Sequence, residues 1–241
     1  MRNIRYIRKL KRKELKKAVI IILVVVLIDQ ISKIYVKTHF HLGESVLIFG
    51  WEKAQILFTQ NRGMAWGAEF GGRTGKFLLT LFRIIAIFAI GYWLRNIIKT
   101  GKPGILIVSV SLIFAGALGN IIDSVFYGVI FDDPQHGIAT LFSGNPYDTF
   151  FHGKVVDMFY FPLWEGILPG WIPIYGGRHF TFFNAIFNVA DAAITIGVLL
   201  LLLFNKRAFS DPRDQEEEFV YGYFDEKGYH MPFDNKEGEK E

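Results

Sequence analysis

Three aspartates lie in apolar parts of the sequence, where an ionised carboxylate is costly and therefore points to a function. Two of them end an Asn-x-x-Asp pattern, which pairs Asn120 with Asp123 and Asn188 with Asp191. The third, Asp157, follows two valines and precedes Met-Phe-Tyr-Phe. Polar contacts between membrane helices would explain the asparagines but not the carboxylates. The three acids are therefore candidates for chemistry.

A spacing of three places both members of each pattern on one face of a helix. We expect two polar stripes of equal spacing, one on each of two helices. Their residues are Gly116, Asn120 and Asp123 on one helix, and Asn184, Asn188 and Asp191 on the other. If the two faces meet, and the segment around Asp157 turns back against them, up to three carboxylates converge.

Two carboxylates held close together at low dielectric share a proton, because the second ionisation is disfavoured. Such a pair hydrolyses an amide without a nucleophilic side chain. The ionised carboxylate takes a proton from water while its protonated partner donates to the scissile carbonyl oxygen, and the roles then reverse to protonate the leaving amine. The spacing leaves open which two of the three acids form the pair.

Membrane helices are the elements expected to position these acids. The chain has 241 residues, of which 51% are hydrophobic and 16% aromatic, and it contains no cysteine. This composition excludes a disulfide framework and a thiolate metal site, and it is typical of a membrane protein. Four apolar stretches approach the roughly 20 residues that cross a bilayer as a helix. They predict an all-α polytopic fold with spans at about 18–36, 77–94, 103–123 and 180–204.

Basic residues indicate the orientation of these spans. Nine of the 27 lysines and arginines lie within residues 1–17, directly before the first apolar stretch, and others follow the second and fourth stretches. A basic N-terminus that runs into an apolar stretch favours a cytoplasmic membrane anchor over a nucleic-acid-binding arm. Four spans then place the C-terminus in the cytoplasm as well.

Two outer segments, 37–76 and 127–179, connect the expected spans outside the cytoplasm. Short strand-like runs at 46–49 and 54–59 predict a small extracytoplasmic β element. The tail at 205–241 is acidic and shows no apolar period, so we expect it to be solvated and disordered in the cytoplasm.

Other ionisable groups lie within the predicted spans. Asp29 and Lys33 are four residues apart, which favours an ion pair that organises the end of the first span. Arg83 interrupts the second stretch, and we expect it near the outer end, with its side chain reaching the interface. Asp191 is expected about 11 residues into the fourth stretch, within the outer leaflet.

Five separated motifs follow one another along the chain. They are Asp29-Gln-Ile-Ser-Lys33, Asn61-Arg-Gly63-Met-Ala-Trp-Gly67, Gly116-Ala-Leu-Gly-Asn120-Ile-Ile-Asp123, Val155-Val-Asp157-Met-Phe and Phe187-Asn188-Val-Ala190-Asp191. In this order, over about residues 18–204, they resemble the bacterial lipoprotein signal peptidases, the signal peptidase II family. The resemblance implies four transmembrane helices with a small extracytoplasmic sheet. It also implies an aspartyl endopeptidase that cleaves a prolipoprotein just before its diacylglyceryl-modified cysteine.

The resemblance extends to individual residues. The family's catalytic aspartates lie in the Val-Val-Asp and Asn-x-Ala-Asp motifs, which implies Asp157 and Asp191 here. Substrate-binding positions match Asn61, Gly63, Gly116, Asn120, Asp123, Asn188 and Ala190. Asp29 and Lys33 match supporting positions of the pocket. The resemblance implies no cofactor, no metal and no nucleic acid, but prolipoproteins and membrane lipids as partners. It further implies a monomer in the bacterial inner membrane, with an active site near the outer leaflet.

Two features depart from the family pattern. The family usually has arginine directly after the aspartate of the third span, whereas Ser124 stands here. A pocket cation is then either missing or supplied from elsewhere, with Arg62 and Arg178 as candidates. Segments 130–154 and 166–179 are insertions, which we expect to form an outer lid or a docking surface.

Two other functions fit parts of the sequence. A catalytically inactive protein that binds lipoprotein precursors is one alternative, because Ser124 and the insertions depart from the family. A proton-relay transporter subunit that uses Asp29, Asp123 and Asp191 is another, although the sequence shows no inverted repeat. A zinc protease is disfavoured because no His-Glu-x-x-His motif occurs.

Overall fold

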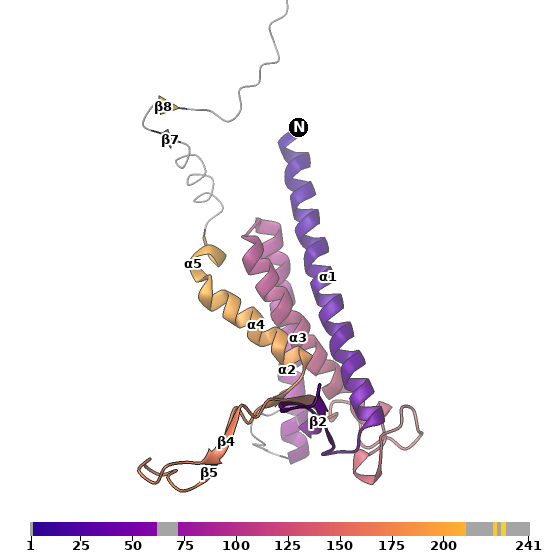
Figure 1. Cartoon of the computed structure of the whole chain (residues 1–241). Coiled ribbons are helices and arrows are strands. Elements are labelled where there is room, and N and C mark those ends of the chain that lie inside the picture. The colour runs from indigo at the N-terminus through magenta and orange to yellow at the C-terminus, as the bar shows by residue number, and fades with distance from the viewer. Residues whose placement is uncertain (1, 62–71, 211–223, 226–227, 230–241) are drawn as a thin grey trace, which may run out of the picture.

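Four helices run side by side and stand on a small sheet in the computed structural model, which describes residues 2–61, 72–210, 224–225 and 228–229 (Figure 1). The helices are α1 (Arg2–His39), α2 (Gly72–Thr100), α3 (Gly104–Ile130) and α4 (Val189–Leu203). Of the helices in the described part of the chain, α1, α2 and α3 are long and apolar enough to cross a membrane, whereas α4 has 15 residues and is shorter. The predicted combination of apolar helices with a small sheet is confirmed.

Three helices extend beyond the predicted stretches. Helix α1 continues through the basic residues before position 18, because lysine and arginine have high helix propensity. Helix α2 begins at Gly72 instead of 77, and α3 continues to Ile130 instead of ending at 123. The apolar period therefore predicts the central part of each of these helices but not its ends.

The predicted span at 180–204 is wrong in its N-terminal part. Strand β5 (His179–Phe182) occupies its start, and α4 begins only at Val189. The side chain of Asn188 accepts a hydrogen bond from the backbone N–H of Asp191 and thereby caps the helix. Asp191 consequently lies in the first turn of α4, not 11 residues into a span.

Helix α3 lies at the centre of the bundle, in contact with α1, α2 and α4. Glycines allow the closest approach. A Cβ atom on Gly116 would overlap the carbonyl oxygen of Ala190, and one on Gly119 would overlap the carboxylate of Asp29. Small residues at helix contacts are typical of membrane bundles. Because these backbones lie so close together, side chains from α1 and α4 meet on the same face of α3.

The main sheet has four antiparallel strands in the order β1-β2-β3-β6. Their bounds are β1 (Ser45–Ile48), β2 (Trp51–Asn61), β3 (Val155–Tyr160) and β6 (Ile186–Phe187). The first two strands coincide with the strand-like runs predicted at 46–49 and 54–59. Strand β3 contacts α1 and α3 and is buried over its first four residues. The segment around Asp157 therefore does turn back against the helices.

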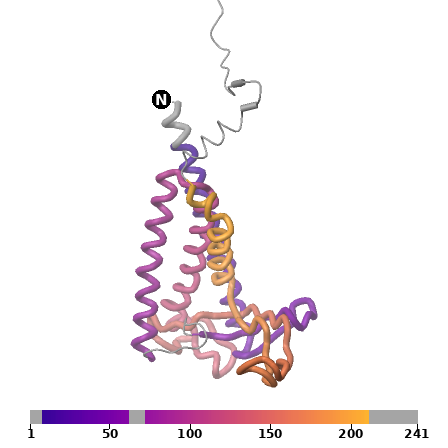
Figure 2. The backbone as a smooth tube through the Cα atoms, turned by 90° about the vertical axis from the view of Figure 1, so that its left-hand side faces the viewer, coloured from indigo at the N-terminus to yellow at the C-terminus, as the bar shows by residue number. Residues whose placement is uncertain are grey.

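The two insertions fold in different ways. Segment 130–154, which includes the short 3-10 helix Pro134–His136, packs against the sheet end of α2. There Arg73 forms an ion pair with Asp148 at 2.9 Å, and the Thr80 hydroxyl donates to a carbonyl of the insertion at 3.0 Å. The second insertion belongs to a hairpin of β4 (Trp164–Ile167) and β5, whose strands pair with each other rather than with the main sheet. This hairpin projects away from the helices (Figures 1 and 2).

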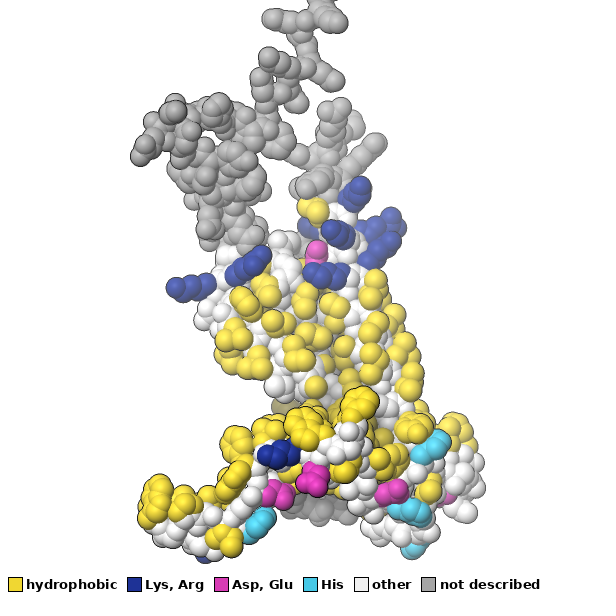
Figure 3. Space-filling model, in the orientation of Figure 1, with side chains coloured by type: hydrophobic (Ala, Val, Ile, Leu, Met, Phe, Trp, Pro, Cys, Tyr) yellow, Lys and Arg dark blue, Asp and Glu magenta, His cyan; other side chains and the backbone are white. Residues whose placement is uncertain are grey.

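Side-chain types separate along the bundle. Figure 3 shows lysines and arginines at the end away from the sheet, an apolar belt over the helices, and acidic and histidine side chains around the sheet. This distribution is typical of a helix bundle whose belt faces lipid. In the predicted tail, α5 (Asn205–Ala208), β7 (Phe224–Asp225) and β8 (Gly228–Tyr229) are the assigned elements, and most of residues 211–241 lie outside the described part.

Candidate active site

Asp157 lies on β3 opposite Thr59 of β2, and only 5% of its surface is exposed. Its carboxylate accepts hydrogen bonds from the amide nitrogens of two asparagine side chains. One is Asn61 at the end of β2, and the other is Asn188, at 2.8 Å. None of the ion pairs among the described residues involves Asp157. The carboxyl group is thus hydrogen-bonded but not neutralised.

Burial, and to a smaller extent the negative charge of Asp191, raise the pKa of Asp157 from 3.8 to about 7. The hydrogen bonds from Asn61 and Asn188 act in the opposite direction but are the smaller effects. A carboxyl group with such a pKa holds a proton for much of the time near neutral pH. It can therefore donate a proton in general acid catalysis.

Asp191 is the third residue of α4 and forms a capping box with Asn188. The N–H of Asp191 donates to Oδ1 of Asn188 at 2.9 Å, and the N–H of Asn188 donates to Oδ2 of Asp191 at 3.4 Å. The other carboxylate oxygen accepts from Nδ2 of Asn120 at 2.8 Å. This carboxylate is partly exposed and lies at a helix N-terminus, where negative charge is stabilised.

Two asparagines connect these acids. Nδ2 of Asn188, which binds Asp157, also lies 3.2 Å from Oδ1 of Asn120. Asn120 in turn donates to Asp191. Neutral amides therefore fix the relative position of the two carboxyl groups without cancelling either charge.

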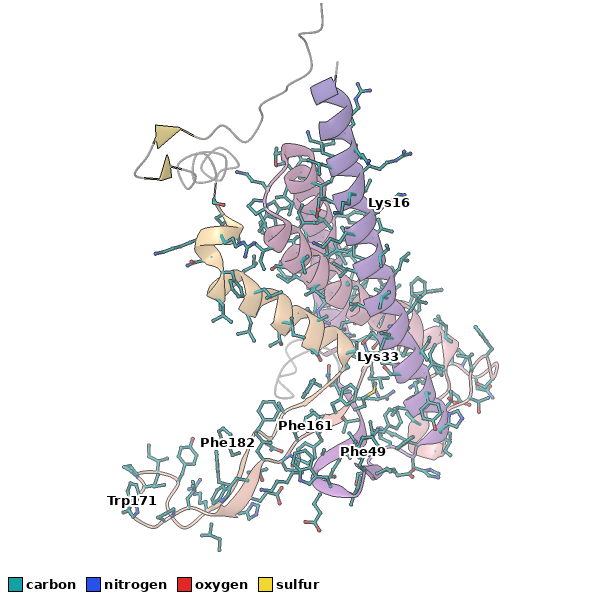
Figure 4. The ribbon with its side chains drawn as sticks, turned by 45° about the horizontal axis from the view of Figure 1, so that its top comes forward. Lys16, Lys33, Phe49, Phe161, Trp171 and Phe182 are labelled. Atoms are coloured by element: carbon teal, nitrogen blue, oxygen red, sulfur yellow. The ribbon has the colours of Figure 1, made fainter. Side chains whose placement is uncertain are left out.

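A second pair of acids lies deeper in the protein. Asp29 and Asp123 each accept from Nζ of Lys33 at 2.9 Å, and all three side chains are fully buried. Lys33 also donates to Oδ1 of Asn120 at 2.9 Å. The predicted Asp29–Lys33 ion pair is thus confirmed, and Figure 4 shows Lys33 on α1 beside the start of α4.

The deeper acids also fix the backbone beside the other two. Asp29 accepts from the N–H of the residue before Asp191 at 2.8 Å, and Asp123 accepts from the N–H of the residue before Asp157 at 3.2 Å. Those two residues are Ala190 and Val156. The lysine between these carboxylates therefore links the start of α4 to the middle of β3.

Several predicted substrate-binding residues are packed inside the protein. Gly116, Asp123, Asn188 and Ala190 are all buried. Gly116 and Ala190 form the contact between α3 and α4, while the polar side chains bond to protein groups. Such positions suit the support of the site better than direct contact with a ligand. Asn120 is more exposed.

One residue of the second predicted stripe lies away from the site. Asn184 lies in the turn before β6, where it accepts from the Tyr160 hydroxyl at 3.3 Å. The second predicted stripe is therefore wrong, because the residues before position 189 are not helical. Gly63 lies outside the described residues.

The cation beside Ser124 comes from α2. Nζ of Lys76 donates to the Ser124 hydroxyl at 3.3 Å, and the lysine is 6% exposed. Of the two predicted candidates, Arg178 does not fill this place, because it is exposed on the β4–β5 hairpin, and Arg62 lies outside the described residues. No local motif marks Lys76, because its contact with Ser124 spans two helices.

Two further side chains were not predicted for the site. Gln30, which stands inside the first sequence motif, donates to both Asp29 and Asp123 at 3.0 Å. Arg83, expected at the outer interface, lies near enough to Asp191 for their charges to interact. Arg83 follows Lys76 by seven residues on α2, and this helical spacing is the signal that places both cations on one face.

Comparison with known proteins finds a matching family and several relatives of this chain. Residues 21–139 and 136–206 match the model of the family described as Signal peptidase (SPase) II. The lipoprotein signal peptidase of Porphyromonas gingivalis is 46% identical over 207 residues, which cover 85% of this chain and 88% of the relative. That of Amoebophilus asiaticus is 38% identical and covers 82% and 80% of the two chains.

The fold has a counterpart among solved structures. One bacterial membrane enzyme is 28% identical in sequence, with a TM-score of 0.51 over 78% of this chain and 91% of that chain. A second bacterial membrane enzyme gives a TM-score of 0.50 at 25% identity and covers 82% and 93%.

Proposed function

This chain belongs to the signal peptidase II family, and on that premise we propose that Asp157 and Asp191 are its catalytic pair. Members of this family are aspartic-type signal peptidases, so the chain is a hydrolase that removes signal peptides from prolipoproteins. One observation carries the assignment of the pair. All four acids that meet at the site accept hydrogen bonds from side-chain amides, but of the four only Asp29 and Asp123 are also paired with Lys33 in the described structure.

The bonding of each acid suggests its role. Asp191 acts as the base: it takes a proton from a water molecule, and the oxygen of that water attacks the scissile carbonyl carbon. Asp157 acts as the acid and donates its proton to the carbonyl oxygen, because burial raises its pKa to about 7. The result is a tetrahedral diol between the two side chains.

Breakdown of the diol reverses the roles. Asp191 gives its proton to the nitrogen of the leaving amine as the C–N bond breaks. Asp157 takes back the proton of one hydroxyl, which restores a carbonyl group in the new carboxyl terminus. Both acids return to their starting states without a covalent intermediate.

The other polar residues position these acids. Asn61, Asn120 and Asn188 hold the two carboxyl groups through amide hydrogen bonds. Asn61 and Asn120 are partly exposed and are proposed to contact the substrate as well, together with Gly63. Asp29, Lys33 and Asp123 are proposed to act as supports, because their side chains are fully buried.

We further propose the arrangement in the membrane. All four helices enter the bacterial inner membrane, with both termini in the cytoplasm and the sheet outside. The basic residues at the end away from the sheet support this orientation. The functional divisions are the basic segment 1–17, the peptidase domain 18–204 and the tail 205–241. The substrate reaches a monomeric enzyme sideways from lipid, since its diacylglyceryl group stays in the outer leaflet.

The proposal is tested with the purified full chain in lipid nanodiscs. A synthetic prolipoprotein peptide with a diacylglyceryl-modified cysteine is incubated with the wild type and with Asp191→Asn, and the products are identified by mass spectrometry. The matched control peptide carries an unmodified cysteine. We expect the wild type alone to cleave, and only the lipidated peptide, directly before the modified cysteine.

Cleavage by a folded Asp191→Asn variant would remove Asp191 from the catalytic pair. Absence of cleavage by a folded wild type would instead leave the alternative of a protein that binds precursors without processing them.

A further inference from the structure

The β4–β5 hairpin, defined here as the arm (residues 164–182), exposes a large amount of apolar surface. Its exposed aromatic and aliphatic residues are Trp164, Ile167, Trp171, Ile174, Tyr175, Phe180 and Phe182. At the tip, Trp171 and Ile174 are each 81% exposed. An exposed apolar patch of this kind marks a surface that contacts a membrane or another protein.

The arm is a built element rather than a loose loop. Its strands pair in register from Trp164 opposite Phe182 to Ile167 opposite His179. The hydrogen bonds continue into the turn, where the N–H of Leu168 donates to the carbonyl of Arg178 at 3.0 Å. The tip residues are therefore presented in a defined way, and no other described element packs over them.

The length of α4 places the arm at a particular depth. Helix α4 has 15 residues and so is about 22 Å long, which is less than the roughly 30 Å of a bilayer's hydrocarbon core. Lys206 and Arg207 follow it directly and favour the polar region at its C-terminal end. The N-terminal end of α4 then lies at or below the boundary between hydrocarbon core and headgroups on the sheet side. The arm ends at residue 182, shortly before α4 begins at Val189.

Helix α2 gives the same depth independently. Its sheet-end turns carry exposed apolar side chains, among them Phe77, Leu78 and Phe82. Figures 1 and 2 both show the arm at the level of this end of α2, with the arm extending sideways below α4. The apolar surface of the arm therefore lies at the same level as the apolar outer surface of the bundle.

The composition of the arm fits the boundary between lipid and water. It carries two tryptophans, a tyrosine and two phenylalanines, which are the residue types enriched at membrane interfaces. Its charged or imidazole side chains are Glu165 and His179, which lie on the strands, and Arg178, which directly precedes β5; none of them lies among the apolar tip residues 171–175. Figure 4 shows Trp171 at the far end of the arm and Phe182 nearer the bundle.

We propose that the arm binds the lipid surface of the sheet-side leaflet, with Trp171, Ile174 and Tyr175 among the headgroups and the upper acyl chains. It extends the membrane contact of the enzyme beside α4, whose first turn holds Asp191. The substrate's lipid-modified cysteine approaches in the same leaflet. This surface is a lipid-binding site separate from the catalytic pair, and its existence does not depend on which acids are catalytic.

The absence of native cysteine allows a direct test. Ile174→Cys and Trp171→Cys are each spin-labelled in the full chain and reconstituted into nanodiscs of phosphatidylethanolamine and phosphatidylglycerol. Collision rates with oxygen, which concentrates in lipid, and with a water-soluble nickel chelate are then measured. The matched control is Gln135→Cys, an exposed side chain on the other insertion, next to two aspartates.

We expect the ratio of oxygen to nickel collisions at both arm positions to exceed the control ratio by at least about threefold, as for side chains in the acyl-chain boundary. Ratios equal to that of the control would show an arm in water and overturn the proposal. Protection from both reagents would show that protein covers the tip, a second copy of the chain or another part of it, and would overturn it as well. Cleavage activity of the labelled variants is recorded separately, so failure of the catalytic proposal is distinguishable.

Discussion

Four aspartates meet between the helices and the sheet, yet they form two pairs in contrasting environments. Asp29 and Asp123 share one lysine at 2.9 Å and are sealed from solvent. Asp157 and Asp191 bond to asparagine side chains, and Asp191 is partly exposed. The first pair shares the positive charge of Lys33, and its oxygens are occupied by hydrogen bonds. In the second pair, Asp157 can hold or release a proton near neutral pH. Asp191 is in contact with solvent.

On the proposed assignment, this contrast means that one residue type serves two purposes within one site. A carboxylate paired with an ammonium group in the interior is a structural link, because removal of one partner leaves an uncompensated buried charge. A carboxyl group held by neutral amides has a fixed position, and it can be either protonated or ionised there. The predictions below separate the two roles by measuring folding and catalysis in the same variants.

The largest effect is expected when the cation of the deep pair is removed. Lys33→Met leaves Asp29 and Asp123 as unpaired buried carboxylates, which costs about 3–5 kcal/mol of folding free energy. We expect the melting temperature in detergent to fall by on the order of 10 °C, and activity to fall with it. Thermal unfolding followed by intrinsic fluorescence measures the change.

Lys37→Met is the matched control, one helical turn further along α1. Lys37 is also fully buried, but its ammonium lies over the rings of Phe131 and Tyr147, at 5.0 and 4.9 Å, and has no hydrogen-bond partner among the described residues. Its loss is expected to change stability by no more than about 1 kcal/mol. Equal destabilisation by both variants would contradict the assigned role of the deep ion pair.

Removal of the link between the pairs is expected to have the next largest effect. Asn120→Ala removes the amide that accepts from Lys33 and donates to Asp191. Because the base is then free to rotate away from the attacking water, kcat should fall about 10–100-fold while the protein stays folded. Ser111→Ala, on the same helix, breaks only a hydrogen bond to the carbonyl of Ile107 and should leave kcat near the wild-type value.

A dependence on pH follows from the environment of Asp157. Its pKa of about 7 means that the proton needed by the acid is lost as the pH rises through that value. We expect kcat/KM to fall by up to tenfold for each pH unit above about 7. A pH–rate profile from pH 5 to 9 tests this expectation, and a rate that stays level to pH 9 would refute it.

The smallest predicted effect is a gain in stability. Because the pKa of Asp157 is higher in the folded protein than its usual 3.8, the folded state loses stability as the pH rises from about 4 to about 7. Above pH 7 this cost is constant. Asp157→Asn removes it, so its melting temperature at pH 8 should exceed that of the wild type by a few degrees. At pH 5 the two should melt closer together.

The sequence predicts the acids of the site better than the way in which they are held. The four-residue spacing of Asp29 and Lys33 on an uninterrupted helix correctly predicts an ion pair. The three-residue spacing of Asn188 and Asp191 is ambiguous, because a helical stripe and a capping box share it. The apolar residues before Asn188 favour a continuous span, but their pairing with β4 and β3 holds them in strands.

The contacts that join distant segments are less accessible to sequence reasoning. Ser124 stands out against the family pattern, but Lys76 meets it only because α2 packs on α3, and nothing local marks the lysine. Likewise, the insertions are visible as extra length, but the sequence does not indicate that one packs on α2 while the other projects as an arm. Tertiary packing decides both outcomes.

The central claim is that the amide-bound acids are catalytic and the lysine-bound acids are structural. The most direct test compares Asp157→Asn with Asp123→Asn, purified in the same detergent and measured for both melting temperature and cleavage of the lipidated peptide. We predict that Asp157→Asn melts at or above the wild-type temperature and cleaves about 10²–10⁴-fold more slowly. Asp123→Asn should melt well below it. A stable but inactive Asp123→Asn, together with an active Asp157→Asn, would contradict the account and assign the catalytic acid to Asp123.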